Sequence, residues 1–204
     1  MKNSILTILA VAAMVACKKN ETTTSDQTAD SAMTAPADTS MNMGDSATTA
    51  MSDSNMSNST LSDQDKKFAD AAATGGMMEV MLGELASTNG SNASVKSLGA
   101  MMVKDHGKAN DELKKWASAS GYTLPTAMNA EQQKQYDDLK AKKGAEFDRM
   151  YAGLMVKDHQ KDIAEFKKQA AEGSDASLKS FASTTLPTLE HHLMEAEKAN
   201  NAVK

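Results

Sequence analysis

The sequence predicts an all-α fold in which residues 62–204 form one four-helix bundle. Four long segments carry apolar residues at spacings of three and four, which is the period of an amphipathic α-helix. Residues that favour helix ends bound these segments, among them Ser62, Asn92 and Gly121. The length of this region is also typical of a single domain.

Each helix can be placed from its apolar stripe and its boundary residues. The expected helices run from Ser62 to Asn89, from Asn92 to about Ser120, from about Ala145 to Glu172, and from Asp175 into the final residues. Pro187 should kink the last helix or lengthen one of its turns, because proline cannot donate a backbone hydrogen bond.

The connections indicate which kind of bundle these helices form. The first and last pairs of helices are joined by tight turns, whereas a connector from Tyr122 to Lys143 joins the pairs and should hold a short helix over residues 129–139. One long crossover is typical of the ferritin-like four-helix bundle. A simple up-down-up-down bundle is the alternative.

Two sequence repeats suggest a duplication, or at least the repeated use of one local structure. Ser91–Leu98 resembles Ser174–Phe181, as expected if the first and second helix pairs are equivalent. Met102–His106 recurs as Met155–His159, but this repeat relates the second helix to the third and does not fit that symmetry. We interpret it as a local functional or packing motif.

The N-terminus has the features of an export signal. Lys2 precedes an apolar run, Ile5–Val15, that is too short for a permanent membrane span. The segment Met14–Cys17 resembles a bacterial lipobox, so we expect residues 1–16 to be a lipoprotein signal peptide and Cys17 to be lipidated. An ordinary cleaved signal that leaves a free thiol is the alternative.

Residues 17–61 are expected to form a lipid-anchored disordered linker. Residues 18–60 contain no aromatic residue and no Val, Ile or Leu, so they cannot bury enough apolar surface to fold. The predicted location is the cell envelope, at the outer membrane and facing the periplasm. The membrane is then one partner, and another envelope protein is a further candidate partner.

Charge and cysteine content exclude several classes of function. Three of the 22 basic residues and six of the 27 acidic residues precede residue 62, so the charges of the bundle nearly cancel. They are interleaved along the chain, and no basic stripe for nucleic acid is expected. Cys17 is the single cysteine, which rules out an intramolecular disulfide.

Each predicted apolar stripe contains one polar residue near its middle. These residues are Glu79, His106, His159 and His192, in chain order over the four helices. Helical bundles build core metal sites in this way, and three imidazoles with one carboxylate suit a divalent transition metal. Asp105, Asp158 and Glu190 are candidate partners of the histidines or extra ligands. The alternative is a purely structural core in which each histidine hydrogen-bonds a carboxylate.

Three segments of the chain also resemble a known family. They are Gly75–Gly83, Met102–His106 with Lys108–Asn110, and Leu186–Leu193. Together they resemble domain of unknown function family 4142, over nearly all of residues 61–204. The resemblance implies an exported bacterial protein, often labelled an outer membrane protein, with a ferritin-like fold. It also places the family's glutamate at Glu79 and its histidines at His106, His159 and His192.

Three classes of function follow. The first is a non-enzymatic envelope lipoprotein whose bundle binds a metal ion or small ligand, and the second is a structural or interaction module without metal. The third, a metal-dependent oxidase, is disfavoured, because ferritin-like di-iron proteins use Glu-x-x-His pairs. Here Val103, Val156 and Leu189 occupy the positions three before the histidines.

Overall fold

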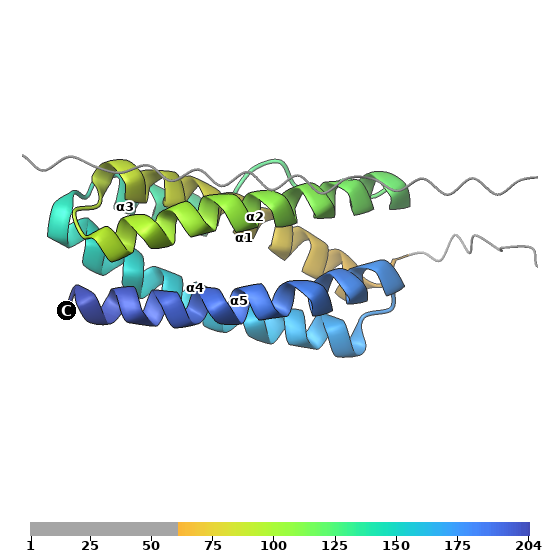
Figure 1. The fold of residues 1–204 in the computed structure, drawn as a ribbon. Coiled ribbons are helices and arrows are strands. Elements are labelled where there is room, and N and C mark those ends of the chain that lie inside the picture. Colours follow the sequence, from red (N-terminus) through yellow and green to blue (C-terminus); the bar gives the residue numbers. More distant parts are fainter. Residues whose placement is uncertain (1–60) are drawn as a thin grey trace, which may run out of the picture. The chain divides into compact units, whose positions relative to one another are not determined.

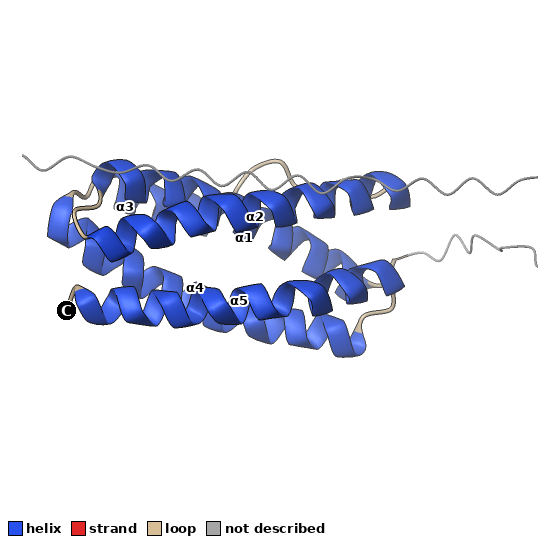
Figure 2. Cartoon of the chain, in the orientation of Figure 1, coloured by secondary structure: helices blue, strands red, loops and turns tan. Residues whose placement is uncertain are grey.

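The computed structural model describes residues 61–204, which form five α-helices and, within that range, no strand (Figures 1 and 2). The helices are α1 (Asp63–Asn89), α2 (Ala93–Ser120), α3 (Ala130–Lys140), α4 (Gly144–Glu172) and α5 (Ala176–Ala202). Each predicted helix is therefore confirmed to within a residue or two. The expected signal peptide, the lipidation of Cys17 and the linker lie outside the described residues.

The topology is that of a ferritin-like bundle, as predicted. Helices α1 and α2 form one antiparallel hairpin and α4 and α5 form the other, with α1 beside α4 and α2 beside α5 (Figure 1). The start of α1 contacts the α4–α5 turn, and the start of α4 contacts the α1–α2 turn. Consequently α2 and α4 run in the same direction, and the crossover that carries α3 must return along the bundle. This excludes the up-down-up-down alternative.

Local sequence explains where the helices begin and end. At the starts of α1, α2, α3 and α5 a side-chain oxygen accepts a hydrogen bond from a backbone N–H group. The residues that provide this oxygen are, in the same order, Ser62, Asn92, Asn129 and Asp175. Gly121 ends α2 in the left-handed conformation, with φ of 68°, which glycine adopts without a steric cost. The last helix continues through Pro187.

Two buried aspartates join the hairpins reciprocally. Asp148 of α4 accepts hydrogen bonds from the backbone N–H groups of Ser91 and Asn92 and from the Ser91 hydroxyl. Asp65 of α1 accepts hydrogen bonds from the backbone N–H groups of Ser174 and Asp175. Each hairpin thus fixes the turn of the other.

These contacts support the predicted equivalence of the hairpins. Each residue of the first hairpin corresponds to the residue 83 positions later, in the second hairpin. Examples are Asp65 and Asp148, Gly90 and Gly173, and Ser91 and Ser174. The relation pairs α1 with α4 and α2 with α5. It does not pair His106 with His159, so the repeated Met-Val-Lys-Asp-His motif is a separate, local feature on the two parallel helices.

The core consists of two apolar clusters. One contains Phe147, Tyr151 and Met102, and the other contains Phe68, Phe166 and Leu178. Gly83 and Gly99 let α1 and α2 approach closely, because a Cβ atom on Gly83 would lie 2.6 Å from the Gly99 carbonyl oxygen. Between the clusters, all four bundle helices contribute a polar residue.

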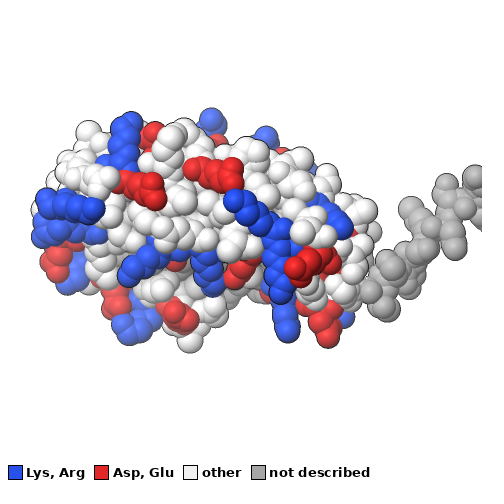
Figure 3. All heavy atoms as spheres, turned by 90° about the horizontal axis from the view of Figure 1, so that it is seen from below, with Lys and Arg blue, Asp and Glu red and all other residues white. Residues whose placement is uncertain are grey.

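The outer surface is charged and mixed. On the face shown in Figure 3, basic and acidic side chains are interleaved. Of the helices in residues 61–204, none combines the length and the apolar character that a membrane span requires.

Candidate metal centre

The four predicted site residues lie together in the polar layer between the apolar clusters. Glu79 of α1, His106 of α2, His159 of α4 and His192 of α5 are all at most 7% exposed. On α2, α4 and α5 the buried apolar residues before the histidine belong to one cluster and those after it belong to the other, and on α1 the change falls between Ala73 and Met78, next to Glu79. The structure thus brings the four predicted side chains together between the two clusters.

Glu79 pairs with two of the histidines. Its Oε2 atom lies 2.9 Å from Nδ1 of His106, and its Oε1 atom lies 3.5 Å from Nδ1 of His159. The Nδ1 atom of His159 also lies 3.0 Å from the Met155 carbonyl oxygen, one helical turn earlier. A carbonyl only accepts hydrogen bonds, so Nδ1 of His159 must carry the proton.

The third histidine extends this network to α2. Nε2 of His192 lies 3.1 Å from Oδ2 of Asp105, and Nδ1 of His192 lies 3.2 Å from Nε2 of His159. Asp105, which the sequence analysis named as a candidate partner of the histidines, thus lies within hydrogen-bond distance of His192. Nε2 of His106 is buried and has no hydrogen-bond partner.

The three imidazoles converge. Their ring centroids are 5.2 to 5.5 Å apart, and one nitrogen from each ring lies within 4.8 Å of the others. The sequence pattern grouped Glu79 with the histidines as a ligand. In the structure its carboxylate instead faces the Nδ1 atoms of His106 and His159.

Glu79 and His106 favour each other's charged forms. Burial opposes the ionised carboxylate, but His106 and His159 outweigh this effect and hold the pKa of Glu79 below its usual range. Burial likewise opposes a charged His106, whereas the Glu79 carboxylate raises the pKa of His106 above its ordinary value. These two residues form a buried ion pair.

The other two histidines are held neutral. Burial lowers the pKa of His159, and the nearby His106 lowers it further, despite the opposing effect of Glu79. Burial also lowers the pKa of His192 to about 4, although its hydrogen bond to Asp105 opposes the shift. Both rings therefore have one nitrogen lone pair available at neutral pH.

The remaining predicted partners lie apart from the rings. Glu190 forms a surface ion pair with Lys167 at 2.9 Å. Asp158 lines a pocket between α1, α3 and α4, and its Oδ2 atom is buried without a hydrogen-bond partner. Burial and the nearby Glu79 raise the pKa of Asp158 to about 7. His191 is exposed, in agreement with its position off the apolar stripe.

Asp162 is a residue of this region that the stripe pattern missed. Burial, Glu79 and Asp158 raise the pKa of Asp162 well above its usual value. It lies 83 positions after Glu79, so the equivalence of the hairpins contains the signal that would have found it. The hydroxyl of Tyr151, a member of the apolar cluster that contains Phe147, is also buried without a hydrogen-bond partner.

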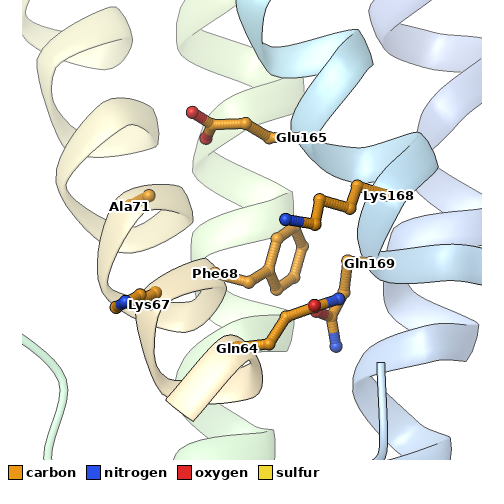
Figure 4. Close-up of a pocket in the computed structure, with 7 residues that line it drawn as sticks. All are labelled: Gln64, Lys67, Phe68, Ala71, Glu165, Lys168 and Gln169. Carbon is orange, nitrogen blue, oxygen red and sulfur yellow. The ribbon is translucent and has the colours of Figure 1, made fainter. Parts of the chain in front are cut away.

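Cavities line the interface of α1 and α4. A surface pocket of about 460 Å³ lies beside Phe68, between Gln64 and Lys67 of α1 and Lys168 of α4 (Figure 4). None of the four clustered residues lines it. A void of about 20 Å³ reaches Glu79 and His106 inside the bundle, and a pocket of about 200 Å³ lies outside Glu79.

Comparisons with known proteins agree on the fold. A crystal structure of a DUF305 fragment from Deinococcus radiodurans is similar at a TM-score of 0.61 and 12% sequence identity, covering 70% of this chain and 98% of that chain. No curated protein matches the chain. The model of a family described as domain of unknown function (DUF4142) matches residues 50–199. The chain therefore belongs to the DUF4142 family.

Proposed function

We propose that His106, His159 and His192 bind a divalent transition metal inside the bundle, and that the protein is a non-enzymatic, metal-binding component of the cell envelope. The observation that carries this proposal is the pair of facing nitrogens on His159 and His192. Each ring already donates its other N–H group, one to the Met155 carbonyl and the other to Asp105. In their neutral forms both facing nitrogens are acceptors, so neither can donate to the other.

A metal ion would satisfy both lone pairs. The two nitrogens are 3.2 Å apart. Two imidazole nitrogens bound to one tetrahedral ion at 2.0 to 2.1 Å are separated by about 3.3 Å. The unpartnered Nε2 of His106 would supply a third ligand once the ring loses the second proton that Glu79 favours in the metal-free protein. This donor set suits a borderline divalent ion such as Zn²⁺, Fe²⁺ or Cu²⁺.

The surrounding carboxylates would orient the ligands. A ligating imidazole commonly donates its other N–H to a carboxylate or a carbonyl, which fixes the ring and raises its basicity. Glu79 would accept this hydrogen bond from His106, and Asp105 would accept it from His192. The Met155 carbonyl would accept it from His159. The absence of any Glu-x-x-His pair in the described helices leaves a di-iron oxidase without its ligands, which is why we propose binding rather than catalysis.

Metal content and thermal stability test the site. The wild-type protein, purified without an affinity tag, should contain one equivalent of metal, and His106→Ala and His159→Ala should each abolish stoichiometric binding. At a metal concentration of 100 times Kd, binding stabilises the folded state by about 2.7 kcal/mol. For a bundle of this size the melting temperature should rise by about 5 to 10 °C.

The exposed neighbour provides the control. His191→Ala should bind metal like the wild type, since this side chain lies outside the cluster. The metal-dependent stabilisation should weaken as pH falls through the raised pKa of His106, because a protonated imidazole cannot ligate. If the cluster is purely structural, the alanine variants will lose stability with or without metal. Equal stabilisation of the wild type and both variants would refute the site.

The proposed location rests on the N-terminal sequence. Its lipobox-like segment, Met14–Cys17, predicts an acyl anchor on Cys17 and a place at the outer membrane facing the periplasm. Cys17→Ser should move the protein from the membrane fraction to the soluble fraction and leave the helical circular dichroism of the bundle unchanged. Full membrane retention of this variant would contradict lipid anchoring.

A further inference from the structure

We propose that the acidic pocket between α1, α3 and α4 is the route by which cations reach the buried histidines. This inference rests on the proposed metal site and adds to it the path of uptake. We call this pocket the acidic chamber. The carboxylates that line it are Glu79 of α1, Glu131 of α3, and Asp158, Asp162 and Glu165 of α4.

The composition of the acidic chamber favours cations. Five acidic residues line it against one basic residue, Lys161, whose ammonium group lies 3.8 Å from Glu165 near the surface. A cleft lined by charge of one sign concentrates ions of the opposite sign. The polar side chains of Gln132 and Gln135 on α3 complete the outer wall.

Two buried carboxylate oxygens have no hydrogen-bond partner. Oδ2 of Asp158 is one, and the second is Oε1 of Glu79, whose side chain is 1% exposed. Burying an acceptor without a partner costs on the order of 1 to 3 kcal/mol. A cation in transit would satisfy both oxygens in turn, and this observation points to a ligand independently of the net charge.

The acidic chamber adjoins the void beside the histidines. The two spaces share Gly75, Glu79, Asp162 and Glu165 in their walls, and His106 lines the inner one. The inner void, of about 20 Å³, has room for about one water molecule or a bare ion. A cation would therefore pass from the outer carboxylates, past Glu79, to the imidazoles.

Gly75 stands at the junction of the two spaces. A Cβ atom built on Gly75 would have no heavy atom within 4 Å. A side chain at this position would therefore begin in open space at the wall that both cavities share. Gly107 of α2 offers a matched position, because its Cβ would also meet nothing and Gly107 lines neither space.

The experiment follows Co²⁺ uptake by visible absorbance in stopped flow, with the purified metal-free full-length chain. We expect Gly75→Leu to slow uptake by at least about tenfold, which corresponds to about 1.4 kcal/mol on a barrier. A route is used in both directions, so chelator-driven release should slow by the same factor and the equilibrium affinity should stay unchanged. Gly107→Leu should leave both rates as in the wild type.

A charge variant tests the same route without steric change. Glu165→Gln should slow uptake several-fold at low ionic strength, and the difference from wild type should shrink at high salt because screening weakens steering. Unchanged rates in both Gly75→Leu and Glu165→Gln would overturn the route. Failure of the wild-type chain to bind Co²⁺ or Zn²⁺ at equilibrium would instead overturn the metal site itself.

Discussion

The two hairpins of the bundle have equivalent residues at their ends but different residues at their centres. Asp65 and Asp148 occupy equivalent positions and perform the same task, since each holds the turn of the opposite hairpin. Glu79 and Asp162 are also equivalent, yet only Glu79 has histidine partners. The ends of the bundle are therefore symmetric and its centre is not.

The asymmetry extends to every histidine of the cluster. The positions equivalent to His106, His159 and His192 hold Leu189, Gly76 and Ala109. Apolar or small residues are therefore accommodated at the positions of the bundle that are equivalent to the three histidines. The packing of the bundle does not require a polar layer, which favours a functional origin for the cluster.

The largest expected effect tests the symmetric ends. Asp148→Ala would leave the Ser91 and Asn92 N–H groups without an acceptor, and Asp65→Ala would do the same at Ser174 and Asp175. Hydrogen bonds to a charged group contribute about 1.5 to 3 kcal/mol each. Each variant should therefore lower the free energy of unfolding by about 3 to 4 kcal/mol, measured by urea denaturation.

Asp63→Ala is the control for these variants. Asp63 is also acidic and lies in the first turn of α1, but its side chain is 93% exposed. Its replacement should cost less than about 1 kcal/mol. A difference of more than about 2 kcal/mol between the Asp65 and Asp148 variants would break the proposed equivalence of the ends.

The next expected effect is a pH dependence of the unfolding free energy that arises from His192 on the second hairpin. In the metal-free protein the pKa of His192 is lowered to about 4, whereas an unfolded histidine titrates near 6.5. Below pH 6.5 the unfolded chain gains a proton that the native chain does not accept until about pH 4. The unfolding free energy should therefore fall by about 3 kcal/mol over this range.

His106, on the first hairpin, contributes a pH dependence of the unfolding free energy with the opposite sign. Its raised pKa contributes stability that is fully present below about pH 6.5 and is lost as pH rises through the native pKa. His192→Gln should reduce the slope between pH 6.5 and 4 in denaturation curves of the metal-free protein by the His192 share of about 3 kcal/mol, and His159, whose pKa is also lowered, should keep its own share. An undiminished slope in this variant would assign the acid sensitivity to other groups.

The fold could be predicted from the sequence because its signals are local. Ser62, Asn92 and Asp175 begin helices wherever they stand before an amphipathic segment, and Gly121 ends one. The long crossover follows from the chain length between α2 and α4. The apolar stripes also placed Glu79 and the three histidines on the inward faces near the middles of their helices, since helical period and distance from a turn fix a residue's face and approximate depth.

The detailed site could not be predicted, because it depends on side-chain directions between helices. The sequence grouped Glu190 with the site since it lies beside His191 and His192, but one step along a helix turns a side chain by about 100°. It missed Asp162, which lies three residues after His159 and off the inward stripe. Which nitrogen of each ring faces its neighbour depends on distances that periodicity does not contain.

The smallest expected effects compare the equivalent carboxylates at the centre. Glu79→Gln breaks the buried pair with His106 and should lower the unfolding free energy at pH 7 by about 2 kcal/mol. A fixed buried pair would cost about 3 to 5 kcal/mol, but His106 can lose its proton and so limit the loss. Urea denaturation of the metal-free protein measures the change.

Asp162→Asn should act in the opposite direction. A raised pKa means that ionising Asp162 costs more in the folded chain than in the unfolded chain, so this group opposes folding above about pH 4. Its neutral amide should therefore raise the unfolding free energy at pH 7 by up to about 1 kcal/mol, and the gain should vanish toward pH 4. Destabilisation by both variants would show that Asp162 has a partner of its own and that the centre is more symmetric than its hydrogen bonds indicate. Opposite signs at two equivalent positions would instead assign the asymmetry to the histidines, because they are what distinguishes the surroundings of Glu79 from those of Asp162.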